Sequence, residues 1–195
     1  MSMPETKKEQ SHARIVEVAS RVIRRTGYRG VGVADIMKEA GLTHGGFYAH
    51  FPSRDAMLVE AMQHAGRCNI AALERGIQRR LSKGGTRLSA LIETYLHETH
   101  IIKTEEGCIV AALASEMIRE SDDLRQEARR RVVAMVDLVK SALPDSADIV
   151  EAQMVTATMV GALQLARTLG GKAGQAILAQ TRQALIERYV LRSQH

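Results

Sequence analysis

One stretch of the sequence, residues 32–58, constrains the fold more than any other. A helical pattern of apolar residues runs to Ala40, and a turn centred on Gly41 follows, because glycine adopts the backbone conformation that other residues resist. A very short second helix containing Phe47 comes next, and Pro52 ends it. Two short helices joined by a glycine turn are typical of a helix-turn-helix, whose second helix lies in the major groove of DNA.

Helical periodicity also dominates the rest of the chain. The strict apolar–polar alternation of strands and the Gly/Asn signals of hairpins are missing. Helices are predicted from a capping box at Thr6 to Gly27, over 33–40, from an N-cap at Thr43, from an N-cap at Ser53 to about residue 80, and over 86–103, 107–118, 122–142, 146–169 and 172–191. We therefore predict an all-α fold, with a three-helix head over 1–55 and a larger helical body over 56–195 that begins inside the long fourth helix.

Composition limits the function classes. Residues 1–55 carry 9 Lys and Arg against 6 Asp and Glu within a total net charge of +5, so the N-terminal end is mildly basic, as polyanion binding requires. No run of about 18 uninterrupted apolar residues occurs, and the N-terminus lacks an apolar secretion core, so we expect a cytoplasmic protein with no membrane partner. Cys68 and Cys108 have no paired metal spacing and are expected to stay reduced.

The segment 146–169 is apolar on nearly all faces, which indicates burial on more than one side. We interpret one side as core and the other as a contact with a second subunit, completed by the last helix in a four-helix seam across a two-fold axis. The predicted homodimer contacts are Val155, Met159, Ala162, Leu165, Ile177 and Leu185.

The helix-turn-helix residues resemble the TetR family of one-component transcriptional regulators. The resemblance rests on Ile36…Ala40-Gly41-Leu42-Thr43-x-Gly45-x-Phe47-Tyr48-x-His50-Phe51…Arg54-Asp55-x-x-Leu58, preceded by Ile15…Ala19…Gly27-Tyr28, and covers about the first 60 residues. The body matches in length, helix count and the stretch Gly107-Cys108…Ala111…Ala114…Glu116. Two departures, Val33-Ala34 and Met37, remove a phosphate contact and alter the helix packing.

The resemblance implies a homodimeric repressor that binds double-stranded operator DNA through the head. The residues expected at the DNA are Thr43, His44, Gly45, Gly46, Tyr48, His50 and Arg54. Thr43 is expected to cap the short helix, the two glycines to let the backbone approach, and Tyr48, His50 and Arg54 to reach phosphates. The alternatives are a core tyrosine at Tyr48 and a merely solvated histidine at His44.

In this family the body binds a small effector, and binding re-angles the fourth helix so that the two heads no longer fit adjacent grooves. Tyr95, Thr99 and Cys108 are the predicted ligand residues of this chain. For Tyr95 and Thr99 the alternative is core with a local hydrogen bond. Cys108 has two interpretations, a redox or electrophile sensor at a helix start and a small packing residue.

The sequence also contains a possible metal-binding set. Glu93, His97 and His100 would share a face of one continuous helix at metal-ligand spacing, but a solvated stripe is favoured, and no metal or cofactor is predicted. No nucleophile elbow, Cys–His pair or phosphate loop appears, so we predict no enzyme and no catalytic residue. The competing hypotheses are an all-α assembly module, or a small enzyme, with a degenerate head.

Overall fold

The computed structural model describes residues 6–191, which form helices and no strand. The elements are α1 (Lys7–Thr26), α2 (Val33–Glu39), η1 (His44–Ala49), α3 (Arg54–Leu81), α4 (Arg87–Tyr95), α5 (Thr99–Ile102), η2 (Thr104–Glu106), α6 (Ile109–Met117), α7 (Asp122–Lys140), α8 (Ile149–Leu169), α9 (Gly171–Ile186) and η3 (Glu187–Leu191). The all-α prediction is confirmed. Some predictions lie outside the described residues. These are the outer limits of the head and the body, at residues 1 and 195, and half of the N-terminal segment that is predicted to lack a secretion core.

The helix ends of the head follow from local side-chain chemistry. Thr6 and Glu9 form the predicted capping box, in which the Thr6 hydroxyl accepts from the Glu9 amide at 3.2 Å and the Glu9 carboxylate accepts from the Thr6 amide at 2.7 Å. Gly27 at φ 74° ends α1, and Gly41 at φ 72° makes the turn after α2. Both glycines occupy the left-handed region that side chains resist, so the turns are set by the sequence.

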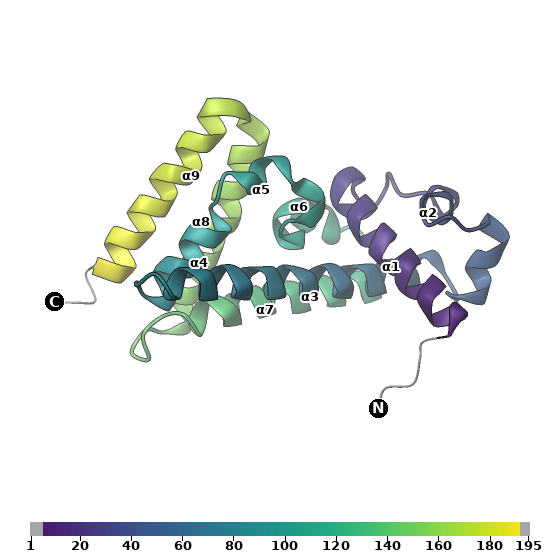
Figure 1. Cartoon of the computed structure of the whole chain (residues 1–195), viewed down its shortest axis with the longest axis horizontal. Helices are drawn as coiled ribbons and strands as arrows, with labels where there is room; N and C mark the ends of the chain where they lie inside the picture. Colours follow the sequence, from purple (N-terminus) through teal and green to yellow (C-terminus); the bar gives the residue numbers. More distant parts are fainter. Residues whose placement is uncertain (1–5, 192–195) are drawn as a thin grey trace.

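Helix α3 is a 28-residue rod that runs from the head along the length of the molecule (Figure 1). Its start is fixed by Ser53, whose hydroxyl accepts from the Ala56 amide at 3.1 Å, as predicted. Its buried stripe includes Leu58 and Met62 near the head and Leu73 and Ile77 in the body, so one apolar core continues through both parts.

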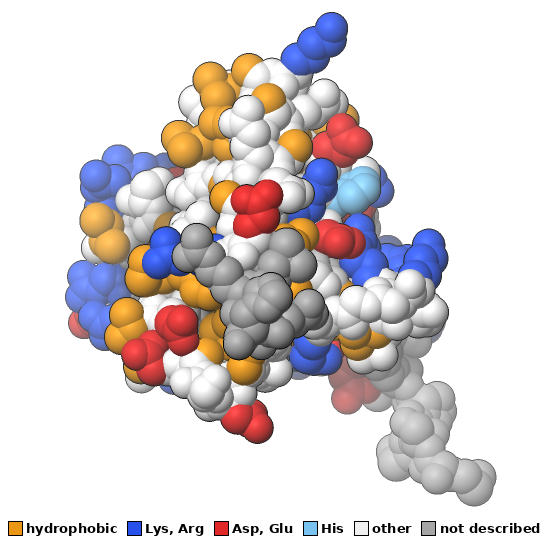
Figure 2. Space-filling view, turned by 90° about the vertical axis from the view of Figure 1, so that its left-hand side faces the viewer, with side chains coloured by type: hydrophobic (Ala, Val, Ile, Leu, Met, Phe, Trp, Pro, Cys, Tyr) orange, Lys and Arg blue, Asp and Glu red, His pale blue; other side chains and the backbone are white. Residues whose placement is uncertain are grey.

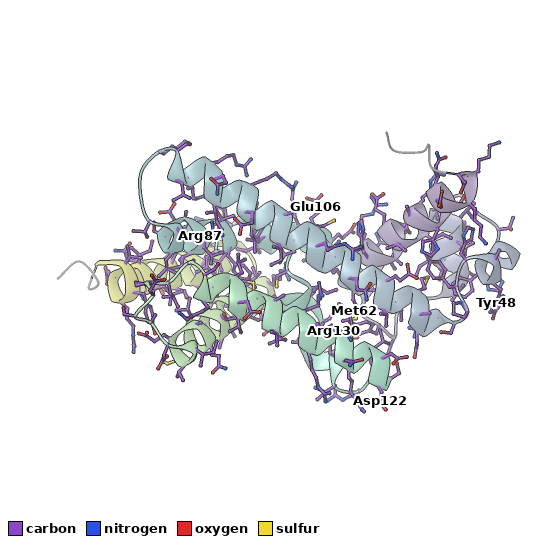
Figure 3. The ribbon with its side chains drawn as sticks, turned by 90° about the horizontal axis from the view of Figure 1, so that it is seen from below. Tyr48, Met62, Arg87, Glu106, Asp122 and Arg130 are labelled. Atoms are coloured by element: carbon purple, nitrogen blue, oxygen red, sulfur yellow. The ribbon has the colours of Figure 1, made fainter. Side chains whose placement is uncertain are left out.

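Helix α7 lies alongside α3 (Figures 1 and 3). The two approach closely at Gly66, where an added Cβ would lie 2.5 Å from Nη1 of Arg131. That guanidinium pairs with the buried carboxylate of Glu127, with Nε 2.8 Å from Oε1. A glycine on α3 therefore gives room for the ion pair that α7 buries against it.

The prediction of a single helix over 86–103 is wrong, because helix α4 ends at Tyr95 and a separate helix, α5, begins at Thr99. The ring Nδ1 of His100 hydrogen-bonds to the Tyr95 carbonyl oxygen at 2.8 Å, and Nδ1 of His97 accepts from the Thr99 amide at 3.3 Å. These side-chain bonds replace the regular backbone bonds of a helix at this point. The expected Glu93/His97/His100 face is consequently divided, and Glu93 pairs instead with Arg80.

Helices α8 and α9 form an antiparallel pair at the end of the body opposite the head (Figure 1). Asp148 caps α8 with Glu151 in a reciprocal box, and α9 continues as a π-helical turn to residue 191. Among the described residues, α8 alone is long and apolar enough to cross a membrane, at 21 residues and a mean hydropathy of 1.3, but 39% of that stretch is buried inside the fold.

The predicted dimer contacts lie mostly on the inner side of this pair. Val155 and Met159 are fully buried, and Ala162 and Leu185 are at most 6% exposed, so these four side chains fill the protomer's own core and the prediction is wrong for them. Leu165 is 58% exposed and Ile177 is half-buried. The outward apolar face of α8 consists of Ile149, Val150, Met154, Leu165 and Leu169. Figure 2 shows hydrophobic side chains gathered at the top of this end of the body, where α8 connects to α9.

Candidate nucleic-acid interface

The short helix η1 forms the exposed tip of the head. It is a 3-10 helix rather than an α-helix, and Thr43, His44 and Gly45 at its start are all exposed. Tyr48 is 74% exposed and extends from the end of the molecule farthest from α9 (Figure 3). Since a tyrosine this exposed contributes little to the core, the core-aromatic alternative for Tyr48 is excluded.

Gly45 and Gly46 differ in their surroundings. A Cβ at Gly45 would meet nothing within 4 Å, so its backbone faces open space. A Cβ at Gly46 would lie 3.7 Å from Cε of Met37, which is fully buried beneath it. The bulky Met37 of α2 is therefore accommodated under Gly46, whereas the space around the Cα of Gly45 is open.

The inner face of η1 fixes the tip to the head. Phe47 and Phe51 stack with their ring centroids 5.6 Å apart, and both are buried, as their four-residue spacing predicts. The Tyr48 ring meets Phe47 edge-on at 5.2 Å. Packing thus holds Phe47 inward and leaves the Tyr48 hydroxyl pointing outward.

Thr43 does not cap η1 with its side chain, contrary to prediction. Its backbone is extended, at φ −80° and ψ 146°, as an N-cap requires, but its hydroxyl makes no capping hydrogen bond. The hydroxyl is exposed, which keeps it available for an external acceptor.

His50 lies in a small aromatic cluster with α1. Its ring centroid is 6.1 Å from that of His12, which stacks on Phe51 at 4.5 Å and binds the Glu60 carboxylate through Nε2 at 2.7 Å. Nδ1 of His50 is buried without a hydrogen-bond partner among residues 6–191. Burial lowers the pKa of His50, with smaller contributions from His12 and Lys8, so the ring is neutral at pH 7.

Arg54 is engaged within the head instead of extending freely from it. Its guanidinium donates to the carbonyl oxygens of Val31, at 3.3 Å, and of Tyr28, and approaches Asp55 at 3.8 Å. These bonds fix the loop between α1 and α2 to the start of α3. We predicted that Arg54 would extend freely to a phosphate. The structure corrects this, because the Arg54 side chain holds parts of the head in position.

Two basic residues near the tip were missed by the sequence reasoning. Arg14 of α1 is exposed and lies near the Gly41 turn, 3.9 Å from the position of a Cβ there. Lys8 is close enough to His50 to lower its pKa. Both lie on the exposed side of α1, and no spacing rule links them to η1, so only the three-dimensional packing reveals the neighbourhood.

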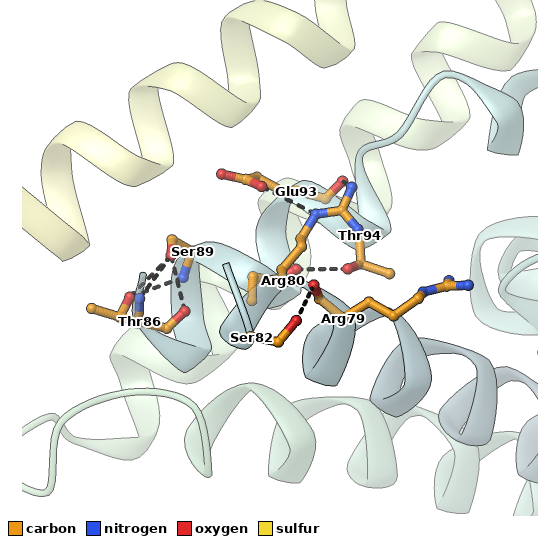
Figure 4. Close-up of polar contacts among 8 residues, drawn as sticks. Arg79, Arg80, Ser82, Thr86, Ser89, Glu93 and Thr94 are labelled. Carbon is orange, nitrogen blue, oxygen red and sulfur yellow. Dashed lines mark hydrogen bonds and ion pairs between the residues drawn. The ribbon is translucent and has the colours of Figure 1, made fainter. Parts of the chain in front are cut away.

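In the body, a cavity of about 280 Å³ lies between α3, α4 and α5. It is lined by Asn69, Ala72, Leu73, Arg79, Arg80, Thr94, His97, Thr99, His100 and Glu106. Of the predicted ligand residues, Thr99 lines this cavity, whereas Tyr95 and Cys108 do not and are 1% and 3% exposed. In Figure 4, Arg80 reaches the Glu93 carboxylate while the Arg79 side chain extends away from it.

Residues 105–116 of the body make polar contacts with α1 and with the loop that follows it. Arg24 of α1, itself buried, donates to the Gly107 carbonyl oxygen at 3.2 Å. Arg25 bridges Glu39 of α2 and Glu105 of η2, at 3.1 and 3.2 Å. Glu116 of α6 accepts from the Tyr28 amide at 2.9 Å. The segment 105–116 therefore contacts the head directly, in addition to the contacts that α3 makes with α1.

The fold and the exposed tip define a helix-turn-helix DNA-binding protein. Residues 15–61 match the family model described as bacterial regulatory proteins, tetR family. The uncharacterized HTH-type transcriptional regulator YxaF of Bacillus subtilis is 30% identical over 125 residues, covering 62% of this chain and 63% of YxaF. The HTH-type transcriptional repressor NemR of Escherichia coli is 23% identical over 133 residues, covering 66% and 65%.

The aligned part thus spans just under two thirds of the length of both relatives. Among solved structures, a TetR transcriptional regulator from Chloroflexus aurantiacus superposes with a TM-score of 0.76 at 20% identity, covering 94% of this chain and 97% of that one. Residues 15–61 therefore form a DNA-binding domain of the tetR family of bacterial regulatory proteins, and the chain as a whole has the TetR-like all-α fold.

Proposed function

We propose that the chain is a homodimeric transcriptional repressor whose affinity for operator DNA is controlled by a small ligand bound in the helical body. The observation that carries the DNA role is the exposed tip of η1. There Gly45 opens the backbone to solvent while Tyr48 projects outward from a packed Phe47. Such a tip fits a major groove, and an exposed tyrosine hydroxyl is a donor for phosphate oxygens.

The DNA face that we propose consists of Thr43, His44, Gly45, Gly46, Tyr48 and His50, with Arg14 and Lys8 beside it. Arg54 acts by holding the loop and α3 together. The direction of regulation, repression, is taken from relatives such as NemR that are described as repressors.

For the dimer we propose the outward face of α8 with the small residues of α9. Ile149, Met154 and Leu165 are each about half exposed on a helix whose other side is core. A contiguous apolar face of this kind marks an interaction surface, and an isologous pair of such faces makes a four-helix seam. Contact with a second subunit at this surface would also explain why α8 has a high mean hydropathy, with no need for a membrane.

We propose that ligand control works between two parts of the chain, a head over 1–55 and a body over 56–195, which α3 joins. On the head side of α3, the Tyr28 hydroxyl contacts Sδ of Met62 at 2.8 Å, and on the body side Glu74 pairs with Arg87. A ligand in the cavity beside α5 would act on Glu105 and Gly107, which contact α1. A coupling of about 1–3 kcal/mol would change DNA affinity roughly 5–150-fold.

The test begins with selection of binding sequences from random duplexes by the purified protein. Fluorescence anisotropy on the selected duplex then compares the wild type with Tyr48→Ala and with Tyr48→Phe, which removes only the hydroxyl. We expect binding that weakens steeply with salt and is lost in Tyr48→Ala at an unchanged melting temperature. A strictly monomeric protein by light scattering, or binding that is the same in Tyr48→Ala, would contradict the proposal.

A further inference from the structure

Next to His100, which lines the cavity, α8 carries a half-buried arginine, Arg167, whose guanidinium has no carboxylate partner among residues 6–191. Nε of Arg167 donates to the His100 carbonyl oxygen at 3.0 Å. Its Nη2 is buried and has no hydrogen-bond acceptor within residues 6–191. Burial lowers the pKa of Arg167, and the groups near enough to favour its charge are Tyr95 and Cys108. A charged group whose donor atom is buried is ordinarily paired, so the Nη2 end of this guanidinium is incompletely compensated.

A second donor without a partner lies beside it. The Tyr95 hydroxyl is buried next to the Cys108 thiol, yet it makes no well-formed hydrogen bond within the described chain. Burial raises the pKa of Tyr95 well above its ordinary value, so the hydroxyl keeps its proton and remains a donor. Buried polar atoms without partners are rare, and two of them in one cluster need an explanation.

The missing group is an acceptor. A guanidinium only donates, the Tyr95 hydroxyl makes no hydrogen bond to it among residues 6–191, and the neighbouring thiol is a weak acceptor. A carboxylate has two oxygens and accepts from an arginine in a charge-assisted bond, which is stronger than a neutral one. It would satisfy Arg167 and Tyr95 together.

The cavity described above gives access to this cluster. His100 lines the cavity, and its ring also meets the Tyr95 ring edge-on at 6.4 Å. The acid would therefore reach Arg167 when the His100 side chain turns. At about 280 Å³ the cavity lies at the small end of ligand pockets, and Asn69, Thr94 and Thr99 make its lining polar.

We propose that the effector is a small carboxylic acid whose carboxylate binds Arg167 and the Tyr95 hydroxyl, with its remaining atoms in the cavity between α3, α4 and α5. This rests on the proposed ligand control and specifies the chemical class of the ligand. The site adjoins the head: Nη2 of Arg167 lies against Gly107, where a Cβ would come within 2.5 Å, and the Gly107 carbonyl oxygen is bound by Arg24 of α1. A carboxylate that draws Arg167 away from His100 and Gly107 changes the surface against which α1 packs.

The test uses thermal melting with sodium acetate, butyrate, hexanoate and benzoate, each beside its primary amide at equal ionic strength. We expect at least one acid to raise the Tm of the wild type by about 2 °C or more while its amide does not. Arg167→Met should abolish the response, and Arg182→Met, a change at a half-buried arginine of α9, should keep it. If acids and amides act alike, or Arg167→Met responds as the wild type does, the proposal is overturned.

A ligand-free measurement tests the same cluster without knowledge of the effector. If Arg167 and Tyr95 are kept for a ligand, Arg167→Met and Tyr95→Phe leave the Tm of the free protein unchanged or raise it. If both lower it by several degrees, their role is structural and the proposal fails. Titration of the selected duplex separates the proposed ligand class from the proposed function. Normal DNA binding with no acid-specific effect refutes only the ligand class. Absent DNA binding refutes the proposed function.

Discussion

The contact between Glu116 and the Tyr28 amide gives the sharpest prediction about how the head is held. The two groups are 88 residues apart in the chain, and the Glu116 carboxylate also lies against Gly27, where a Cβ would meet its oxygens at 2.5 Å. We expect Glu116→Ala to loosen the loop after α1, because the Tyr28 amide loses its only described acceptor.

The magnitude follows from the type of bond. A hydrogen bond to a charged acceptor contributes about 1.5–3 kcal/mol, and an amide left without a partner adds to the loss where it stays buried. Because Glu116 is half-buried, water recovers part of this, so a destabilisation of about 1.5–3 kcal/mol is expected. For a chain of this length that lowers the Tm by roughly 3–10 °C.

Calorimetry measures the change in Tm, and amide hydrogen exchange measures the local effect at Tyr28. Glu120→Ala, on the same turn of chain but without a bond to this amide among the described residues, is the control and should change both quantities little. If Glu116→Ala shifts the Tm by less than 1 °C and leaves exchange at Tyr28 unaltered, the contact does not hold the head.

Further predictions concern packing, pH and assembly. Gly76→Ala should destabilise the protein by about 1–3 kcal/mol in urea melts, because the new Cβ would lie 2.3 Å from a side chain of α4, whereas Gly161→Ala, with nothing within 4 Å, should stabilise it by up to about 1 kcal/mol. Burial lowers the pKa of His100 in the folded state, so the unfolded chain binds the proton more readily. The stability of the protein should therefore fall as the pH drops below the unfolded pKa of about 6.5. When the Tm is measured from pH 8 to 5.5, His100→Gln should show a weaker dependence of Tm on pH than the wild type. Leu165→Asp should give monomers in sedimentation velocity while Val133→Asp, a change at an equally exposed residue of α7, should not, and the opposite result would place the interface elsewhere.

Much of the head was predictable because its determinants are local. The Thr6 capping box, the left-handed Gly27 and Gly41, and the Ser53 cap each depend on side chains within a few residues. The same is true of the inward pair of phenylalanines, which follows from helical spacing. Such features are predictable because the residues that determine them are close together in the sequence.

The parts that could not be predicted depend on distant groups. The apolar pattern of α8 has two apolar sides, and periodicity alone does not say which one packs inward, so Val155 and Met159 were assigned to the wrong side. Arg54 reaches carbonyl oxygens 23 and 26 residues earlier in the chain, a contact that spacing rules do not describe. The break after Tyr95 is likewise set by histidine side chains bonding to backbone groups.

The most direct measurement is the affinity of Gly45→Val for the selected duplex. Because a Cβ added at Gly45 would meet nothing within 4 Å in the protein, we expect the valine to fit without a clash and the Tm to stay unchanged. If the backbone at this point enters the major groove, the valine occupies the space of the base edges and affinity falls at least tenfold, or about 1.4 kcal/mol. Wild-type affinity in Gly45→Val would mean that DNA does not approach this tip.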